Sequence, residues 1–408
     1  MKPSQQTKPA PSTAPSDVPA IATPTPGRVA SVDALRGFDM FWIIGGHAIV
    51  FALAGLFWDP LPDWLGYQMS HPPWIGFSAW DMIMPLFLFI VGVAMPFSFG
   101  KRLAQGQSRF QIYRKVVVRT LVLFFLGTIA QGNLLDFKLD TLHIYCNTLQ
   151  AIAVGYLFAS IIMLELPLSL QIAATGGCLA GFWALMTYVP YRGGEAGMLD
   201  PFNNLALYID HAVLGRFDDG NSYTWILSGL GFTATVMLGV FGGKILRGGW
   251  AAWTKAAALS AVGIACLAAG WIWGFWLPAV TADATGGFAK QLAFPVIKHL
   301  WTGSMVFWAG VWIYLLLAAF YVLIDILGFR RWAFPFIVIG ANAIAVYMAT
   351  HVIRFREITD PLLNGLMDQM RRVERLAPAE ELVRSVAALL LIWFLLWYMY
   401  RKKTFIRI

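Results

Sequence analysis

The sequence predicts an all-α integral membrane protein, a polytopic bundle of about ten transmembrane helices with both termini in the cytoplasm. Of its 408 residues, 58% are hydrophobic and only 13% are charged, whereas a soluble domain carries about 25% charged residues. Apolar stretches of about twenty residues, long enough to cross a bilayer, recur along the chain. Basic and acidic connections alternate between them, as expected when Lys and Arg remain in the cytoplasm.

Residues 1–30 are rich in Pro, Ser, Thr and Ala and lack apolar periodicity. Such a segment cannot bury enough apolar surface to offset the entropy lost on ordering, so we expect a disordered cytoplasmic arm. The apolar run that follows is too long for the hydrophobic region of a signal peptide. The membrane domain is therefore predicted to occupy residues 31–408.

Ten apolar stretches after Arg36 are predicted to span the membrane. Each is expected to be helical, because lipid offers no water to satisfy backbone amides and carbonyls. The predicted spans are residues 37–57, 79–99, 115–132, 147–165, 169–189, 222–246, 252–279, 301–327, 332–352 and 382–400.

The connections orient the bundle. Residues 101–119 and 401–407 are basic and contain no acid, whereas residues 190–221 contain more acids than basic residues. Since Lys and Arg accumulate in cytoplasmic loops, this alternation predicts that both termini lie inside. Residues 353–381, predicted outside, mix Arg with Glu and are interpreted as a charged surface helix.

Composition also argues against several kinds of partner. The net charge of +8 follows from the cytoplasmic Lys and Arg and does not indicate a nucleic-acid partner. The cysteines Cys146, Cys178 and Cys266 have no paired spacing, and no metal-ligand cluster, glycine-rich phosphate loop or serine-nucleophile elbow is present. The sequence therefore predicts no metal site.

Ionisable residues inside membrane helices are costly and are candidates for function. The first stretch carries Asp39 and His47, with Arg36 at its mouth. Arg36, Met40, Ile43 and His47 follow at three- and four-residue steps and therefore share one helical face. Asp39 is close enough to Arg36 to pair with it on a helix. The structural alternative is a buried Arg–Asp pair, with His47 satisfied by a nearby carbonyl.

A second pair of ionisable residues flanks the start of the second stretch. His71 lies ten positions before Asp81, so the two can meet only if the intervening loop folds back into the membrane. Pro72 and Pro73 stiffen this approach and prevent the helix from starting early. A histidine in such a turn is a candidate general base, because its pKa lies near neutral pH.

Further polar residues interrupt the apolar pattern. Gln150 and Asn342 lie within predicted spans, while Lys298 lies at the outer mouth of the eighth span, followed by Trp301. Hydrogen bonding between helices accounts for most such residues in a membrane bundle. The chain has no convincing internal repeat of the kind found in secondary transporters.

Two stretches, SVDALRGFDMFWIIGGH at 31–47 and HPPWIGFSAWDMIMPLFLFIVG at 71–92, resemble the heparan-α-glucosaminide N-acetyltransferase family and its bacterial relatives. Other segments agree in order, namely TLQAIAVGYL at 148–157, NLALYIDHAVLGR at 204–216, WILSGLGFTATVMLGVFGGKIL at 225–246, PVIKHLWTGSMV at 295–306, GANAIAVY at 340–347 and YRKKTFIRI at 400–408. The resemblance covers nearly all of residues 31–408 and identifies them as a transmembrane acyltransferase domain.

The resemblance implies an enzyme that takes acetyl from acetyl-CoA on the cytosolic side and delivers it to the amine of a terminal glucosamine on the far side. The family's active histidine falls on His71 and its acid on Asp81, the glutamine of an LQ pair falls on Gln150, and a conserved-motif lysine and tryptophan fall on Lys298 and Trp301. The family is often dimeric, so a homodimer is a candidate assembly.

Two residues depart from the family pattern, since His47 and Ile297 stand where it has asparagine. We expect the arm at 1–30 in place of the large luminal N-terminal domain of the lysosomal enzyme. We therefore expect a small cell-wall amino sugar as acceptor rather than heparan sulfate, and a multi-pass protein of a bacterial inner membrane.

The resulting hypothesis has the acyl-pantetheine arm of CoA threading the bundle from the basic cytoplasmic ends to His71. This residue either accepts the acetyl group or removes a proton as the amine attacks. Asp81 would orient the ring, and Gln150 or His47 would donate to the oxyanion. The candidate substrate- and acyl-CoA-binding residues are Arg36, Asp39, His47, Gln150, Lys298, Trp301 and Asn342.

Two alternatives from other classes use the same polar residues. An amino-sugar permease, or a membrane protein associated with transport, would need them along a substrate path and would move sugar without acetyl-CoA. An envelope assembly protein would need His71 only to cap a loop and would be indifferent to acetyl-CoA.

Overall fold

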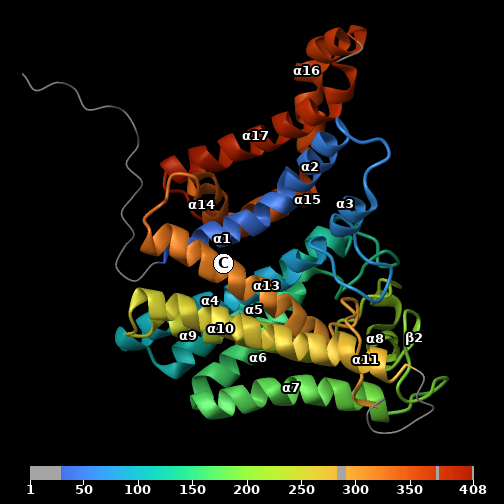
Figure 1. The fold of residues 1–408 in the computed structure, drawn as a ribbon, viewed down its shortest axis with the longest axis vertical. Coiled ribbons are helices and arrows are strands. Elements are labelled where there is room, and N and C mark those ends of the chain that lie inside the picture. The colour runs from blue at the N-terminus through green and yellow to red at the C-terminus, as the bar shows by residue number, and fades with distance from the viewer. Residues whose placement is uncertain (1–28, 283–290, 374–375, 407–408) are drawn as a thin grey trace, which may run out of the picture.

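The computed structural model describes residues 29–282, 291–373 and 376–406. Most of the arm predicted at 1–30 lies outside these residues, and the first helix already begins at Ala30. The described chain is helical apart from one short antiparallel hairpin, which confirms the predicted all-α class (Figure 1).

The first half of the chain builds six long helical segments and a small outer cap. Its elements are α1 (Ala30–Phe41), η1 (Trp42–Gly46), α2 (His47–Ala54), α3 (Asp63–Gln68), η2 (Trp80–Met82), α4 (Ile83–Ala104), α5 (Arg109–Gln131), η3 (Leu134–Asp136), α6 (Thr148–Glu165), α7 (Leu168–Tyr188), β1 (Leu199–Asp200), β2 (Asn203–Asn204), α8 (Leu205–Leu214), η4 (Gly215–Phe217) and α9 (Gly229–Arg247).

The second half adds helices that pack on α9 and on α1. Its elements are α10 (Ala252–Trp271), η5 (Ile272–Trp276), α11 (Leu277–Val280), α13 (Gly303–Phe320), η6 (Tyr321–Ile326), α14 (Phe334–Ala341), α15 (Ala343–Val352), α16 (Phe355–Arg372), η7 (Ala377–Ala379) and α17 (Glu380–Arg401).

Eight helical segments of the described chain are long and apolar enough to cross a membrane, and the bent pair α14–α15 makes a ninth. The one predicted span that is not among these nine, residues 115–132, coincides with α5, a helix of 23 residues that packs beside α6. Basic side chains at Arg114, Lys115 and Arg119 make its first half less apolar than the other spans. The chain is therefore a polytopic membrane protein. Helix α5 is less apolar than the membrane-spanning segments around it.

Glycines allow the central helices to approach closely. A Cβ atom at Gly92 on α4 would lie 1.9 Å from the carbonyl oxygen of Val236 on α9, and one at Gly239 would lie 2.0 Å from that of Phe89. On the other side of the bundle, a Cβ at Gly37 of α1 would lie 1.7 Å from the carbonyl oxygen of Phe336 on α14. Small residues are the usual means of packing membrane helices this tightly.

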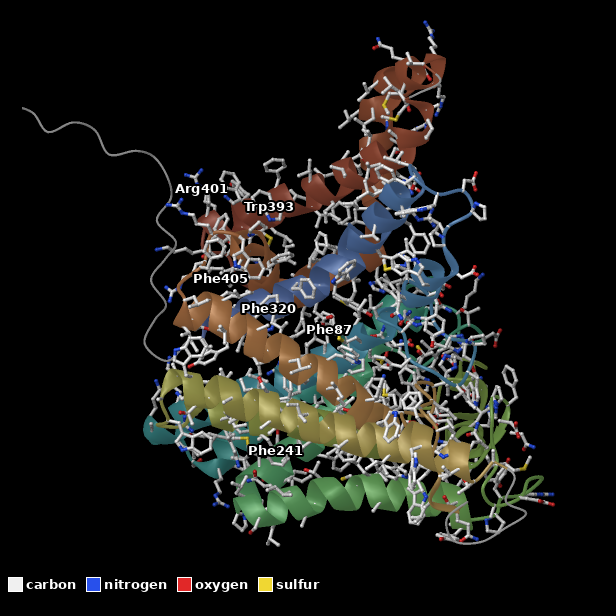
Figure 2. The ribbon with its side chains drawn as sticks, in the orientation of Figure 1. Phe87, Phe241, Phe320, Trp393, Arg401 and Phe405 are labelled. Atoms are coloured by element: carbon white, nitrogen blue, oxygen red, sulfur yellow. The ribbon has the colours of Figure 1, made fainter. Side chains whose placement is uncertain are left out.

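The described N-terminal and C-terminal residues lie at the same end of the bundle, on the left in Figure 1. The backbone amides of Ala30 and Ser31 donate to the Asp325 carboxylate at the end of η6, at 3.3 and 3.1 Å. The basic ends of α4 and α9 also lie here, since Gly100 is packed against the Arg247 guanidinium. Figure 2 labels Arg401 and Phe405 at this end. We refer to it as the inner end, because its basic residues predict a cytoplasmic location.

The first membrane helix is interrupted by the π-helical turn η1. Gly45 in this turn has a φ of 156°, outside the helical region. A π-turn adds one residue to the helical turn and therefore rotates the following residues about the helix axis. His47, the first residue of α2, is consequently displaced from the helical face that Arg36, Met40 and Ile43 form.

The segment predicted as a charged surface helix at 353–381 is α16 with the start of α17. It projects beyond the bundle at the top of Figure 1. Ion pairs link the two helices, including Arg384 with Asp360 at 2.7 Å and Arg371 with Glu380 at 2.6 Å.

Candidate active site

The loop before α4 folds back against the segment that precedes α13. Ile75 forms an isolated antiparallel bridge with Ile297, and the Gly76 amide donates to the Val296 carbonyl at 2.9 Å. This pairing fixes the loop that carries His71 beside the segment that carries Lys298. The predicted return of the loop toward Asp81 is confirmed.

His71 and Asp81 meet directly. The His71 Nδ1 atom lies 2.6 Å from Asp81 Oδ1, and the Asp81 side chain is 1% exposed. The other carboxylate oxygen, Oδ2, accepts from the Ser78 amide at 3.0 Å. Because a carboxylate only accepts hydrogen bonds, this contact requires the proton of a neutral imidazole to lie on Nδ1. The Nε2 lone pair is then available to attack an acyl group or accept a proton.

Lys298 completes a compact polar group. Its Nζ atom lies 3.0 Å from Asp81 Oδ1 and 3.3 Å from His71 Nδ1. Burial lowers the pKa of the Lys298 ammonium, and the charge of Asp81 acts in the opposite direction. The ammonium thus compensates the buried carboxylate, whose isolated charge would be costly here.

A layer of aromatic and hydroxyl groups supports this triad. The imidazole of His299 stacks on the ring of Tyr223 at 4.0 Å between centroids, and its Nδ1 atom lies 2.8 Å from the Ser222 hydroxyl. Burial and the adjacent Lys298 lower the pKa of His299 to about 4. His299 is therefore neutral at physiological pH and contributes packing rather than charge.

His71 and Lys298 open onto a cavity of about 310 Å³, which we call the outer cavity. It lies at the end of the bundle opposite the basic inner end, close to the small outer cap. Its walls are formed by Ile43, His71, Trp80, Ile83, Met84, Gln131, Cys146, Thr148, Asp219, Asn221, Tyr223, Trp225 and Lys298.

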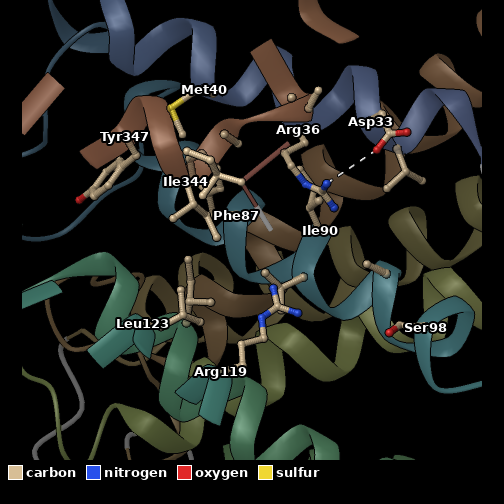
Figure 3. Close-up of a pocket in the computed structure, with 18 of the residues that line it drawn as sticks. Asp33, Arg36, Met40, Phe87, Ile90, Ser98, Arg119, Leu123, Ile344 and Tyr347 are labelled. Carbon is tan, nitrogen blue, oxygen red and sulfur yellow. Dashed lines mark ion pairs between the residues drawn. The ribbon is translucent and has the colours of Figure 1, made fainter. Parts of the chain in front are cut away.

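A larger cavity of about 550 Å³, the inner cavity, lies between α1, α4, α5, α6 and α15. Three basic residues, Arg36, Lys101 and Arg119, line it together with Asp33, while most of its remaining wall is apolar. Figure 3 shows the guanidinium groups of Arg36 and Arg119 extending into it from opposite walls, with Arg36 paired to Asp33 at 3.7 Å.

The two cavities share one wall residue, Thr148, the first residue of α6. The walls are also continuous along two helices. Met40 lines the inner cavity and Ile43, one turn later, the outer one, while Phe87 and Met84 are related in the same way on α4. The bundle therefore holds two adjoining cavities, with His71 in the outer one and basic residues in the inner one.

The residues predicted in the first membrane helix separate. Arg36 lines the inner cavity and pairs with Asp33 rather than with Asp39. Asp39 is buried, and neither of its carboxylate oxygens has a hydrogen-bond partner among the described residues. The Nε2 atom of His47 lies 2.8 Å from the Met69 carbonyl oxygen, and its ring packs on Trp80 at 3.9 Å between centroids. His47 thus supports the wall of the outer cavity from behind.

Three other predicted residues line neither cavity. The Gln150 amide donates to the Ile144 carbonyl and the Thr128 hydroxyl and accepts from the Cys146 amide, at 2.8 to 3.0 Å. Trp301 is buried and donates to the Thr235 hydroxyl at 3.0 Å. Asn342 donates to the Thr404 carbonyl and accepts from the Ile406 amide, at 3.1 and 2.9 Å. Their polar groups are used in holding the fold, so the site described here does not include them.

Sequence reasoning missed several residues that line the cavities. Thr148 is an ordinary helix-start residue in sequence, and Asp219, Asn221 and Tyr223 lie in a loop that served only to orient the bundle. The only feature of the sequence that could have indicated the three loop residues is their position, because a loop between two membrane spans can cover the outer end of the bundle. Within the described residues, no group of three or more His, Cys, Asp or Glu could hold a metal ion.

No protein-family model matches the chain. Two curated relatives, the heparan-alpha-glucosaminide N-acetyltransferases of Homo sapiens and Mus musculus, are each 24% identical to it. The alignments cover 94% and 93% of this chain but 60% and 61% of those proteins, so the chain spans about 60% of the length of the curated relatives it matches. The similarity over most of this chain supports a distant family relationship.

Proposed function

We propose that this chain, a distant relative of the heparan-alpha-glucosaminide N-acetyltransferases, is a transmembrane acetyltransferase of a bacterial inner membrane. It would take acetyl from acetyl-CoA bound at the inner end and deliver it to the amine of an amino sugar at the outer end. One observation carries the proposal. His71 lies in a cavity that adjoins, at Thr148, a second cavity lined by basic residues from the opposite end.

The inner cavity has the properties that acetyl-CoA requires. The phosphates of CoA cannot cross lipid, and Arg36, Lys101 and Arg119 offer cationic groups to hold them at the inner end. Beyond these groups the wall is largely apolar, which suits the slim and nearly neutral pantetheine arm. The arm would run past Thr148 and bring its thioester to His71.

The chemistry at His71 follows from its contacts. Asp81 accepts a hydrogen bond from Nδ1–H and fixes the ring, so that Nε2 acts on the thioester or on the acceptor amine. In one route, Nε2 attacks the thioester carbonyl, the C–S bond breaks and CoA leaves as thiolate. The amine then attacks the acetyl-imidazole, the bond from the acetyl carbon to Nε2 breaks, and Nε2 takes up the proton that the amine loses. In the other route, Nε2 takes the amine proton as the nitrogen attacks the thioester directly, and the C–S bond breaks to release CoA as thiolate.

The oxyanion that either route creates needs hydrogen-bond donors. Gln150 and His47, the donors expected from the sequence, are engaged by other residues. The Thr148 hydroxyl is likewise engaged, by the Tyr347 side chain, so the backbone at the start of helix α6 is the better situated group where the two cavities share Thr148. The positive end of a helix dipole stabilises developing negative charge. We therefore assign the start of helix α6, at Thr148, to the carbonyl of the thioester.

His71→Ala is the direct test. Purified protein in lipid nanodiscs, given radiolabelled acetyl-CoA and a panel of amino sugars, should acetylate a sugar, and the variant should lose this activity by about a thousandfold or more. Binding of acetyl-CoA, measured by calorimetry, should be preserved. His351→Ala, at an exposed histidine that lines neither cavity, is the matched control.

Retained transfer in His71→Ala would refute the assignment. Labelled enzyme trapped by acid quench, before sugar is added, would select the acyl-imidazole route, and its absence the direct one. Flux of amino sugar into proteoliposomes without acetyl-CoA would instead favour the permease.

A further inference from the structure

The outer cavity carries one carboxylate on its wall. Asp81 lies behind the wall and is compensated by Lys298, so the carboxylate that lines the cavity is Asp219. Its charge reaches the interior, because burial and Asp219 together raise the pKa of the neighbouring Cys146 thiol to about 12. Asp219 therefore adds a negative charge to the wall of the outer cavity.

The loop that carries Asp219 is held firmly in place. The Ile144 amide donates to the Phe217 carbonyl at 3.2 Å, and the His143 ring contacts the Asp218 carbonyl at 2.9 Å. The Asn221 backbone amide donates to Asp219 Oδ1 at 3.0 Å and so forms a tight turn. Among the residues that the structure describes, no hydrogen-bond donor contacts Asp219 Oδ2. A preorganised carboxylate oxygen thus lines the same cavity as the proposed catalytic histidine.

A second group on the wall also lacks a partner. Trp225 is 5% exposed and lines the outer cavity, yet its indole Nε1–H has no hydrogen-bond partner among the described residues. The Nε1 atom itself is buried, so the indole ring rather than its N–H group is what Trp225 offers to the cavity. Together with Tyr223 it gives the outer cavity an aromatic wall beside the carboxylate.

We infer that Asp219 binds the amino group of the acceptor as it enters in its ammonium form, while the side-chain amides of Asn221 and Gln131 bind its hydroxyl groups. The inference rests on the proposed function and specifies its acceptor as a small, cationic, polyhydroxylated primary amine. The aromatic faces of Tyr223 and Trp225 suit the apolar face of a sugar ring. Asp219 is a specificity residue here, and the acetyl transfer itself remains at His71.

Asp219→Asn tests the inference with D-glucosamine as the probe. Calorimetric titration of the detergent-solubilised full chain without acetyl-CoA should give a dissociation constant for glucosamine at least tenfold higher in the variant. In steady state, KM for glucosamine should rise by the same factor, while KM for acetyl-CoA stays unchanged. Asp219→Glu should restore part of the affinity, which a purely structural role of the side chain would not predict.

Asp140→Asn is the matched control. Asp140 is an exposed acid in the neighbouring outer connection and lines neither cavity, so the substitution changes the formal charge of the same end by the same amount. It should leave both constants unchanged. An equal shift in the control would attribute the effect to long-range charge and overturn the inference.

Equal glucosamine binding by wild type and Asp219→Asn would overturn the inference, as would a wild-type protein that does not bind glucosamine. Failure of the proposed function has a different signature, namely glucosamine binding that depends on Asp219 without any acetyl transfer.

Discussion

The inner and outer cavities adjoin one another in the same bundle, yet they are lined by different kinds of residue and by different structural elements. The inner cavity is the larger and combines an apolar wall with three basic residues, whereas the outer cavity carries an imidazole, a carboxylate, amides and aromatic rings. The inner wall comes mainly from long membrane helices. Much of the outer wall comes from loops that fold back over the helix ends.

The difference teaches how such a bundle can separate two tasks. An anionic donor needs charge at the inner end and a plain passage beyond it, which regular helices supply. The acceptor needs directional polar groups, which the loops before α4, α9 and α13 supply, because their backbones are free of helical periodicity. Thr148 lines both cavities, so substitutions at this residue give the most direct test of whether the two cavities have separate tasks.

Closing the junction should produce the largest effect. Thr148→Phe places a ring between the cavities, so the thioester should no longer reach His71, and kcat should fall by about 100-fold. The affinity for glucosamine, measured by calorimetry, should fall by a smaller factor, because Thr148 also lines the outer cavity but Asp219, which binds the amino group, lies in a separate loop. Thr148→Ser, which keeps the hydroxyl, should remain active, and full activity in Thr148→Phe would show that the donor takes another path.

Weakening the inner cavity should affect only the donor. The Arg119 guanidinium lines this cavity and lies 4.6 Å from the centroid of the Tyr156 ring. A hydrogen bond to a charged group contributes about 1.5–3 kcal/mol, so Arg119→Gln should raise KM for acetyl-CoA about tenfold or more. KM for the amino sugar should not change.

The control for that experiment is Arg109→Gln, because Arg109 is exposed at the same end and pairs with Glu165. It removes the same charge without touching the cavity. If both variants weakened acetyl-CoA equally, general attraction of the anion by the inner surface would explain the result better than a defined site.

The smallest effect concerns the packing behind the outer cavity. The pKa of His299 is about 4 in the folded chain, against about 6.5 when unfolded. Below pH 6.5, His299 is therefore protonated in the unfolded chain but stays neutral in the folded chain. The free energy of unfolding consequently decreases as the pH falls toward 4. His299→Asn should show a smaller drop in Tm between pH 7.5 and pH 5 than the wild type.

His351→Asn is the control for the acid effect, since His351 is exposed and lines neither cavity. It should reproduce the wild-type drop. An identical drop in His299→Asn would mean that other groups govern acid stability.

Much of this architecture follows from the sequence because membrane helices are specified by simple physics. Apolar length predicted the spans, and helical periodicity placed Arg36, Met40 and Ile43 on the face that now lines the cavities. The same periodicity misplaced His47, because a π-turn at Gly45 rotates the helix beyond it. The expected Arg36–Asp39 pair was wrong for a related reason, since Arg36 turns toward Asp33 instead.

The outer wall could not be predicted in the same way. His71 and Asp81 were paired from a resemblance and a spacing, but Asp219 and Trp225 reach the site through loops whose paths depend on tertiary contacts. The contact of His143 with the Asp218 carbonyl, which holds the loop of Asp219, joins residues 75 positions apart. Local sequence patterns carry no information about such a contact.

The break between α14 and α15, a bend of 74° at Asn342, has a consequence for the inner cavity. It leaves the Asn342 side-chain amide available for hydrogen bonds with the backbone of residues 404 and 406. These hydrogen bonds place Phe405 and Ile406 in the cavity wall. The segment at 404–406 is thus built into the wall of the proposed donor compartment. A fusion tag, a bound protein or mechanical tension applied there would alter acetyl-CoA affinity first, leaving sugar recognition untouched.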